Sequence, residues 1–226
     1  MKRLYVLIVL TLIIAMSCTK LDRFPETNLS DVNFWKTSDN FQQACNVFYT
    51  LVDGQFAIRF DDVRSDFAFN SANGANEISA GTRIAPSTSQ DWDNSYKMIF
   101  DANNIIEKAA KATDVTDINR WIGEAKFWRA YAYFQLVSNF GDVPLVLNTL
   151  DIGSPELHEA RTERSLIIKQ IYDDLNYAAK NLLSFKELGA SGYGRASKSA
   201  ALAFKARVAL YEGTRQKFHK YGDPSS

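Results

Sequence analysis

The sequence contains few of the residues that most often carry catalysis or bind metal ions. Among its 226 residues there are two histidines and two cysteines. His158 is followed by Glu159, but no second histidine comes three residues later, so the zinc-protease motif is incomplete. The glycine-rich stretch at 189–194 lacks the Gly-Lys-Ser/Thr ending of a phosphate-binding loop. We therefore expect no metal ion, no cofactor and no catalytic residues in this chain.

An excess of charge of either sign is also absent. Lys and Arg together number 26, and Asp and Glu together also number 26, so no net field attracts nucleic acid. The carboxylate pairs Asp61-Asp62 and Asp173-Asp174 are neighbours in sequence, and neighbouring side chains point apart on a helix. A glycosidase needs two carboxylates about 5–9.5 Å apart across a cleft, which adjacency does not supply. We interpret Asp173 and Asp174 as part of the solvated face of a helix.

The apolar run at the N-terminus is too short to span a membrane. Lys2 and Arg3 precede a nearly unbroken apolar run from Leu4 to Met16. A helix of that length spans about 20 Å, whereas the hydrocarbon core of a bilayer is about 30 Å thick. Positive residues followed by a short apolar run are typical of a secretory signal peptide. We therefore predict that residues 1–17 are a signal peptide.

The two cysteines have different predicted roles. Cys18 directly follows the apolar run, as in bacterial lipoproteins, where signal peptidase cuts before a cysteine that carries lipid. An ordinary secreted protein cleaved nearby is the alternative, because Met16 departs from the lipoprotein pattern. Lipid on Cys18 would tether the protein by burying acyl chains in a membrane leaflet. Residues 18–32 are predicted to form a polar leader, residues 33–226 a helical domain, and Cys45 a buried free thiol within it.

The stretch 119–140 predicts a helix that is buried on two sides. One apolar set recurs at steps of three and four residues, and a second set covers much of the remaining circumference. The first set is Trp121, Ile122, Ala125, Trp128, Ala132, Leu136 and Phe140, and the second is Phe127, Ala130, Tyr131 and Phe134. Gly141 suits a left-handed C-cap, and Pro144 prevents the helix from resuming.

Part of this helix is repeated later in the chain. An alanine, an arginine and a tyrosine spaced by four residues occur twice, as Ala125, Arg129 and Tyr133 and as Ala203, Arg207 and Tyr211. Matching faces of this kind occur in helix-pair arrays such as tetratricopeptide proteins, where small residues let helices approach closely. Two unrelated core helices are the alternative reading.

Four further amphipathic stretches predict helices at about 39–55, 92–110, 165–182 and 197–212. The predicted N-cap of the first helix is Ser38 or Asp39, and that of the central helix is Thr116 or Asp117. The predicted N-caps of the last two helices are Thr162 or Ser165 and Ser197. Asn103 lies on the apolar face of the second stretch, which predicts a buried amide that bonds to a neighbouring element. The chain is thus expected to be all-α.

The longest irregular stretch, residues 59–91, is the candidate binding segment. It is rich in Asn, Ser, Ala and Gly, with aromatic and arginine residues between them. Loops of this length in compact proteins are usually functional or disordered. Amides and guanidinium groups hydrogen-bond sugar hydroxyls, and aromatic rings pack on the apolar faces of sugars. The candidate ligand-binding residues are Phe69, Asn70, Asn73, Asn76 and Arg83, and the alternative is a solvated surface loop.

Several of these pieces, in this order, resemble the SusD/RagB family of nutrient-binding outer-membrane lipoproteins. After the lipoprotein-like start at Cys18, the matching stretches are Asn33-Phe34-Trp35-Lys36-Thr37, then 92–107, 124–136, Phe140-Gly141-Asp142-Val143-Pro144-Leu145-Val146, 174–182 and 203–211. Together they cover most of residues 18–213. The resemblance implies a tetratricopeptide-like helical scaffold that carries long irregular loops.

The resemblance also implies a location and a partner. Members of this family are lipid-anchored in the outer leaflet of the outer membrane of Bacteroidetes-type bacteria and face the cell exterior. They act as a lid on a TonB-dependent transporter of the SusC type, to which they deliver oligosaccharides or other oligomeric nutrients. Members are considerably longer than this chain, so we expect an N-terminal portion whose array is incomplete at its C-terminus. Its last helix would then expose an apolar face.

Two other functions compete with nutrient binding. A tetratricopeptide-type scaffold with a peptide or protein ligand and no sugar role is compatible with the same helices. An enzyme is the third hypothesis, which the sparse histidines and the adjacent carboxylates make the weakest of the three.

Overall fold

The computed structural model of the protein describes residues 34–52, 62–65, 68–69 and 76–219. The chain divides into two units, Met1–Trp35 and Lys36–Ser226, and the helices discussed below belong to the second unit. The predicted signal peptide, the leader and Cys18 lie outside the described residues.

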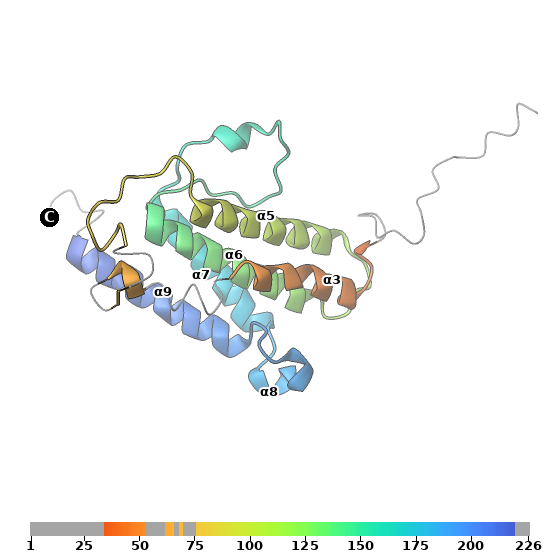
Figure 1. The fold of residues 1–226 in the computed structure, drawn as a ribbon. Coiled ribbons are helices and arrows are strands. Elements are labelled where there is room, and N and C mark those ends of the chain that lie inside the picture. The colour runs from red at the N-terminus through yellow and green to blue at the C-terminus, as the bar shows by residue number, and fades with distance from the viewer. Residues whose placement is uncertain (1–33, 53–61, 66–67, 70–75, 220–226) are drawn as a thin grey trace, which may run out of the picture. The chain divides into compact units, whose positions relative to one another are not determined.

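The described part of the second unit is built from helices. The α-helices are α3 (Ser38–Cys45), α5 (Gln90–Lys111), α6 (Ile118–Phe140), α7 (Arg164–Asn181), α8 (Phe185–Leu188) and α9 (Lys198–His219). Short 3₁₀ turns lie at Asn46–Thr50, Asp62–Arg64, Pro155–His158 and Ala190–Gly192. Helix α6 packs against α3, α5 and α7, and α7 in turn packs against α9 (Figure 1). The predicted all-α, tetratricopeptide-like architecture is confirmed.

Helix α6 is the centre of the core, as its two apolar sides predicted. Ala125, Tyr133 and Leu136 are fully buried on one side, and Ala130 and Phe134 are buried on the other. Full burial of a large apolar side chain stabilises a fold by about 1.5–3 kcal/mol relative to exposure. The apolar side chains of α6 therefore lie on more of its circumference than one neighbouring helix could bury, and the helix needs neighbours on both sides.

The end of α6 also agrees with prediction. Gly141 has φ 74° and ψ −123°, and its N–H donates to the carbonyl of Val137. The chain continues as an extended segment in which Val143 forms an isolated antiparallel bridge with Thr162. Cys45 is buried and free, as predicted, and burial raises the pKa of its thiol.

Several predicted helix boundaries are wrong for local reasons. Thr37, not Ser38 or Asp39, caps α3, since its side chain accepts from the Asn40 N–H in a capping box. That helix ends at Cys45 and tightens into a 3₁₀ turn instead of reaching residue 55. Helix α7 begins after Glu163, because the backbone of Thr162 is engaged in the bridge to Val143.

The predicted equivalence of the two Ala–Arg–Tyr triplets is also wrong. Ala125, Arg129 and Tyr133 are all buried on α6. On α9, Ala203 and Arg207 are exposed and Tyr211 is 38% exposed. The buried residues of α9 are instead Ala201, Val208 and Glu212. The two triplets therefore share a spacing but not an environment.

The conformation of Gly141 leads to a first prediction. Gly141→Ala should destabilise the protein by about 1–2 kcal/mol, because an L-residue at this positive φ is strained. Gly213→Ala is the matched control: Gly213 lies inside α9 with open space around it, so alanine should raise stability by about 0.5–1 kcal/mol. Urea unfolding of both variants measures the difference, and equal effects would contradict the assignment of strain to Gly141.

Candidate functional site

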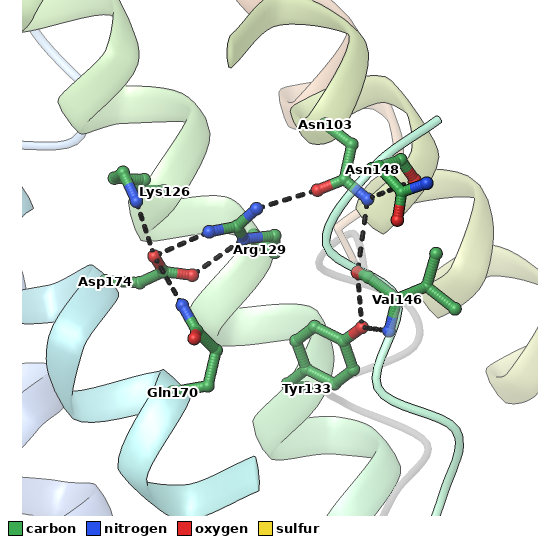
Figure 2. A network of polar contacts seen from close by, with 8 residues as sticks. All are labelled: Asn103, Lys126, Arg129, Tyr133, Val146, Asn148, Gln170 and Asp174. Atoms are coloured by element: carbon green, nitrogen blue, oxygen red, sulfur yellow. Dashed lines mark hydrogen bonds and ion pairs between the residues drawn. The ribbon is translucent and has the colours of Figure 1, made fainter. Parts of the chain in front are cut away.

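A buried polar network joins α5, α6 and α7 (Figure 2). The Arg129 guanidinium on α6 contacts the Asp174 carboxylate on α7 twice, from Nε at 2.7 Å and from Nη2 at 2.8 Å. Its Nη1 donates to Oδ1 of Asn103 on α5 at 2.8 Å. Arg129 is 3% exposed and Asp174 is fully buried. A bidentate contact of this kind is among the stronger polar interactions in proteins.

Asp174 accepts two further hydrogen bonds. Lys126 Nζ lies 2.9 Å and Gln170 Nε2 lies 3.1 Å from its Oδ1. The interpretation of Asp174 as a solvated charge is therefore wrong, whereas its neighbour Asp173 is exposed and pairs with Lys169. Asp174 follows the buried Ile171 by three residues and precedes the buried Ala178 by four. That helical spacing was the signal in the sequence that could have placed it on the inner face.

The network continues into the extended segment that follows α6. The Asn103 amide nitrogen donates to the carbonyls of Val146, at 3.2 Å, and Asn148, at 3.0 Å. The Tyr133 hydroxyl accepts from the Val146 N–H at 2.7 Å and donates to the Val146 carbonyl at 2.8 Å. The prediction of a buried amide at Asn103 is confirmed. Side chains of α5 and α6 thus form the hydrogen bonds that the backbone groups of Val146 and Asn148 would form with a neighbouring strand in a sheet.

Two more side chains of α5 hold the same segment. The Tyr96 hydroxyl donates to the Pro144 carbonyl at 2.8 Å. The Glu107 carboxylate accepts from the Thr149 N–H at 2.6 Å and from its hydroxyl at 2.8 Å. Burial raises the pKa of both Tyr96 and Tyr133 above the ordinary value of tyrosine, so both hydroxyls keep the protons they donate at neutral pH.

Irregular segments leave the α5–α6 pair at the same end. The ring of Trp92, near the start of α5, lies 5.2 Å from that of Phe140, at the end of α6. The Arg161 guanidinium lies 5.8 Å from the Trp92 ring and donates to the carbonyls of Phe140 and Asp142. The segment 76–89, which leads into α5, and the segment 141–163, which follows α6, therefore start from one end of the helix pair (Figure 1).

The candidate ligand residues have different positions in the described chain. Phe69 is 71% exposed, and Arg83 is also exposed. The Asn76 side-chain oxygen accepts from the Ile78 N–H at 2.9 Å, which closes a turn. Asn70 and Asn73 lie outside the described residues. No hydrogen bond, ion pair or ring contact joins these three described residues to one another, and their role in binding stays a prediction.

A second buried ion pair, which sequence analysis missed, ties the start of the helical unit to α9. Arg195, three residues before α9, contacts Glu124 of α6 at 2.7 Å and Asn46 at 2.6 Å. The Tyr49 hydroxyl donates to Glu124 at 2.9 Å and accepts from the Ala196 N–H at 2.8 Å. Burial raises the pKa of Glu124, and the Arg195 guanidinium opposes that rise. The Glu124 carboxylate therefore links Tyr49 to Arg195, and with the Asn46–Arg195 contact it holds together segments about 150 residues apart in sequence.

Within the described ranges, no group of three or more His, Cys, Asp or Glu side chains could hold a metal ion. The helices that the structure describes also include none with the length and apolarity needed to cross a bilayer.

The geometry defines a class of protein: a tetratricopeptide-like helical scaffold, braced by buried ion pairs, that presents irregular segments at one end. A match to the SusD-like family, described as starch-binding and associating with the outer membrane, covers residues 6–210. The chain belongs to this family. The resemblance that the sequence motifs suggested is therefore confirmed.

Individual relatives agree with this assignment. SusD-like protein P38 of Formosa agariphila is 28% identical over 214 residues, which are 91% of this chain and 41% of that protein. A SusD-like carbohydrate-binding protein of Bacteroides fragilis is 29% identical, with a TM-score of 0.70 over 81% of this chain and 39% of its own. A laminarin-binding SusD-like protein is 27% identical, with a TM-score of 0.64 over 80% of this chain and 41% of its own. The chain thus spans about two fifths of the length of these relatives.

The Arg129–Asp174 pair leads to a second prediction. Asp174→Asn should destabilise the protein by about 3–5 kcal/mol, because it leaves the buried Arg129 guanidinium without a counter-charge. Asp173→Asn is the control, since its pair with Lys169 is exposed and should contribute less than about 1 kcal/mol. Denaturant unfolding monitored by circular dichroism measures the free energy of unfolding of both variants. Similar decreases in the two variants would show that the buried pair stabilises the fold no more than the exposed pair does.

Proposed function

We propose that this protein is an outer-membrane lipoprotein that binds oligosaccharide, or another oligomeric nutrient, and delivers it to a SusC-type TonB-dependent transporter. Lipid on Cys18 would anchor it in the membrane with the helical unit facing the cell exterior. The observation that supports this most strongly is the family match over residues 6–210. The names of the carbohydrate-binding and laminarin-binding relatives agree with it.

We place the ligand surface of this chain on the irregular stretch 59–91. The exposed ring of Phe69 offers an apolar face to a sugar, and the exposed Arg83 offers planar hydrogen-bond donors. Asn70, Asn73 and Asn76 would add amide donors and acceptors. These groups bind a ligand without breaking its bonds, and the proposal therefore assigns no catalytic step to the protein.

The scaffold has a defined part in this proposal. Asn103, Tyr133 and Glu107 hold the segment 144–149 on the helix pair at several points. The segment 76–89 starts from the same end, beside Trp92. A binding surface on loops gains affinity when the loop bases are fixed, since less conformational entropy is lost on binding.

The ligand proposal is tested with a panel that includes starch-derived maltooligosaccharides and laminarin. Phe69→Ala and Arg83→Ala should each weaken binding by at least about fivefold, as expected for residues at the centre of a binding surface. Isothermal titration calorimetry on the mature protein measures the affinities.

Phe185→Ala is the matched control for the aromatic change, because Phe185 is also exposed, at 63%, but lies on α8. Its affinity should equal that of the unchanged protein. If Phe69→Ala and Arg83→Ala also bind normally, the ligand surface lies elsewhere.

The anchor is tested by metabolic labelling with radiolabelled palmitate. Cys18→Ala should abolish incorporation and release the protein from the membrane fraction, because burial of acyl chains supplies the attachment. Cys45→Ala removes the other cysteine, which is buried in the core, and should keep the label. A labelled Cys18→Ala protein would contradict lipid attachment at this position.

A further inference from the structure

The segment 150–160 is held against α5 at both of its ends. Before it, the N–H and the hydroxyl of Thr149 donate to the Glu107 carboxylate. After it, the Arg161 guanidinium lies 5.8 Å from the Trp92 ring. The segment therefore leaves α5 beside Glu107 and returns beside Trp92, and the residues between project from the helices (Figure 1). The segment 76–89 enters α5 at the same end as Trp92.

The turn inside this segment is ordered by its own hydrogen bonds. The Ser154 N–H donates to the Asp151 carbonyl, and the Ser154 hydroxyl accepts from the Asp151 N–H, both at 2.9 Å. The Leu157 N–H then donates to the Ser154 carbonyl at 3.1 Å, within the 3₁₀ turn Pro155–His158. A preformed projection of this kind loses little conformational entropy when a ligand covers it.

The projection presents two kinds of side chain to solvent. Ile152 is 101% exposed and Leu157 is 50% exposed. Asp151 and Glu159 are exposed, and Glu156 is half-exposed. A neutral sugar needs both kinds of contact, because apolar side chains cover its C–H groups and carboxylate oxygens accept from its hydroxyls.

The segments that meet beside Trp92 carry an excess of negative charge. Residues 76–93 and 150–163 contain seven Asp or Glu against two Arg, which gives a net charge of −5 with His158 neutral, although the chain as a whole is balanced. None of the seven carboxylates forms an ion pair with a described residue. They are Glu77, Asp91, Asp93, Asp151, Glu156, Glu159 and Glu163, and the arginines are Arg83 and Arg161. Such a field repels a polyanion and leaves a neutral ligand unaffected.

We propose that the segment 150–160 is a second wall of the ligand surface, and that this wall admits neutral oligosaccharides and excludes polyanionic ones. Ile152 and Leu157 contact the apolar faces of the sugar rings, and Glu156 and Glu159 accept from sugar hydroxyls. The stretch 59–91 forms the other wall. The proposal rests on the proposed function, since it assigns a ligand class to the same surface. A sulfated or uronate-rich chain would place its charges beside unpaired carboxylates.

The ligand class is tested with laminarin and maltooligosaccharides, each beside its chemically sulfated form, which keeps the backbone and adds charge. In isothermal titration calorimetry on the mature protein at about 0.1 M salt, the sulfated form should bind at least about tenfold more weakly. Raising the salt to about 0.5 M should strengthen binding of the sulfated form, because screening shortens the range of the repulsion. The affinity for the neutral form should stay within about twofold.

A pair of double variants assigns the selectivity to the wall. Glu156→Gln with Glu159→Gln removes two charges at nearly constant size and should strengthen binding of the sulfated form at least about threefold. Asp114→Asn with Asp117→Asn is the control, because it removes two exposed carboxylates beyond the other end of α5. That helix has 22 residues and is about 33 Å long, several screening lengths at this salt. Both control residues have φ near 60°, which asparagine also adopts.

The contact and the charge of the wall are measured separately. Ile152→Ser should weaken binding of the neutral form at least about threefold, and a fully exposed side chain can be changed without loss of the fold. A fluorophore on Ile152→Cys, in a Cys18→Ala background where Cys45 stays buried, reports the local field without any glycan. Relative to the free dye, caesium should quench it more efficiently than iodide. The same dye on Ala203→Cys, exposed on α9 one turn before Arg207, should show the opposite order.

Several results would overturn the proposal. Equal or tighter binding of the sulfated form would contradict the exclusion of polyanions while leaving the proposed function intact. Normal affinity of Ile152→Ser for the neutral form would remove the segment from the ligand surface. Binding of neither form would contradict the oligosaccharide function itself. In that case weaker quenching by iodide at residue 152 would still support the charge of the wall, and equal quenching by the two ions would overturn it.

Discussion

The buried guanidinium of Arg129 is the constraint on which the arrangement of the central helices depends. A charge with 3% exposure is costly unless every donor finds an acceptor, and its acceptors come from two other helices. Asp174 of α7 neutralises the charge, and Oδ1 of Asn103 on α5 accepts from Nη1 of the guanidinium. Apolar packing alone would allow α5 and α7 to slide along α6, whereas these directional contacts select one register.

The same constraint extends to a segment without regular structure. Asn103 uses its oxygen for Arg129 and its nitrogen for two backbone carbonyls, so one amide links the ion pair to residues 146 and 148. Tyr133 adds a two-way contact to Val146. Irregular segments in binding proteins need fixed bases and variable outer parts. Here side chains of α5 and α6 fix the base of the segment that follows α6.

Sequence patterns predicted where the helices lie better than they predicted which side chains meet between helices. The spacing of Ala125, Leu136 and their neighbours predicted a helix buried on two sides, and the amide at Asn103 was correctly expected to be buried. Asp174 was misread because its helix also carries the exposed Asp173, and no local pattern reveals that Arg129 stands opposite. The Ala–Arg–Tyr repeat failed for a similar reason, since identical spacing does not ensure identical neighbours. Phe69 and Arg83 stay a prediction based on chemistry.

By itself the sequence determined the all-α class, the family and the course of the central helix to Gly141, because helical periodicity and glycine conformation are local properties. Only the tertiary structure decided which charged side chains pair with one another inside the core and which apolar side chains of α9 are exposed among the described residues. Both depend on which helices come together, and the energy of a charge or an apolar side chain is set by its surroundings in space rather than by its neighbours along the chain.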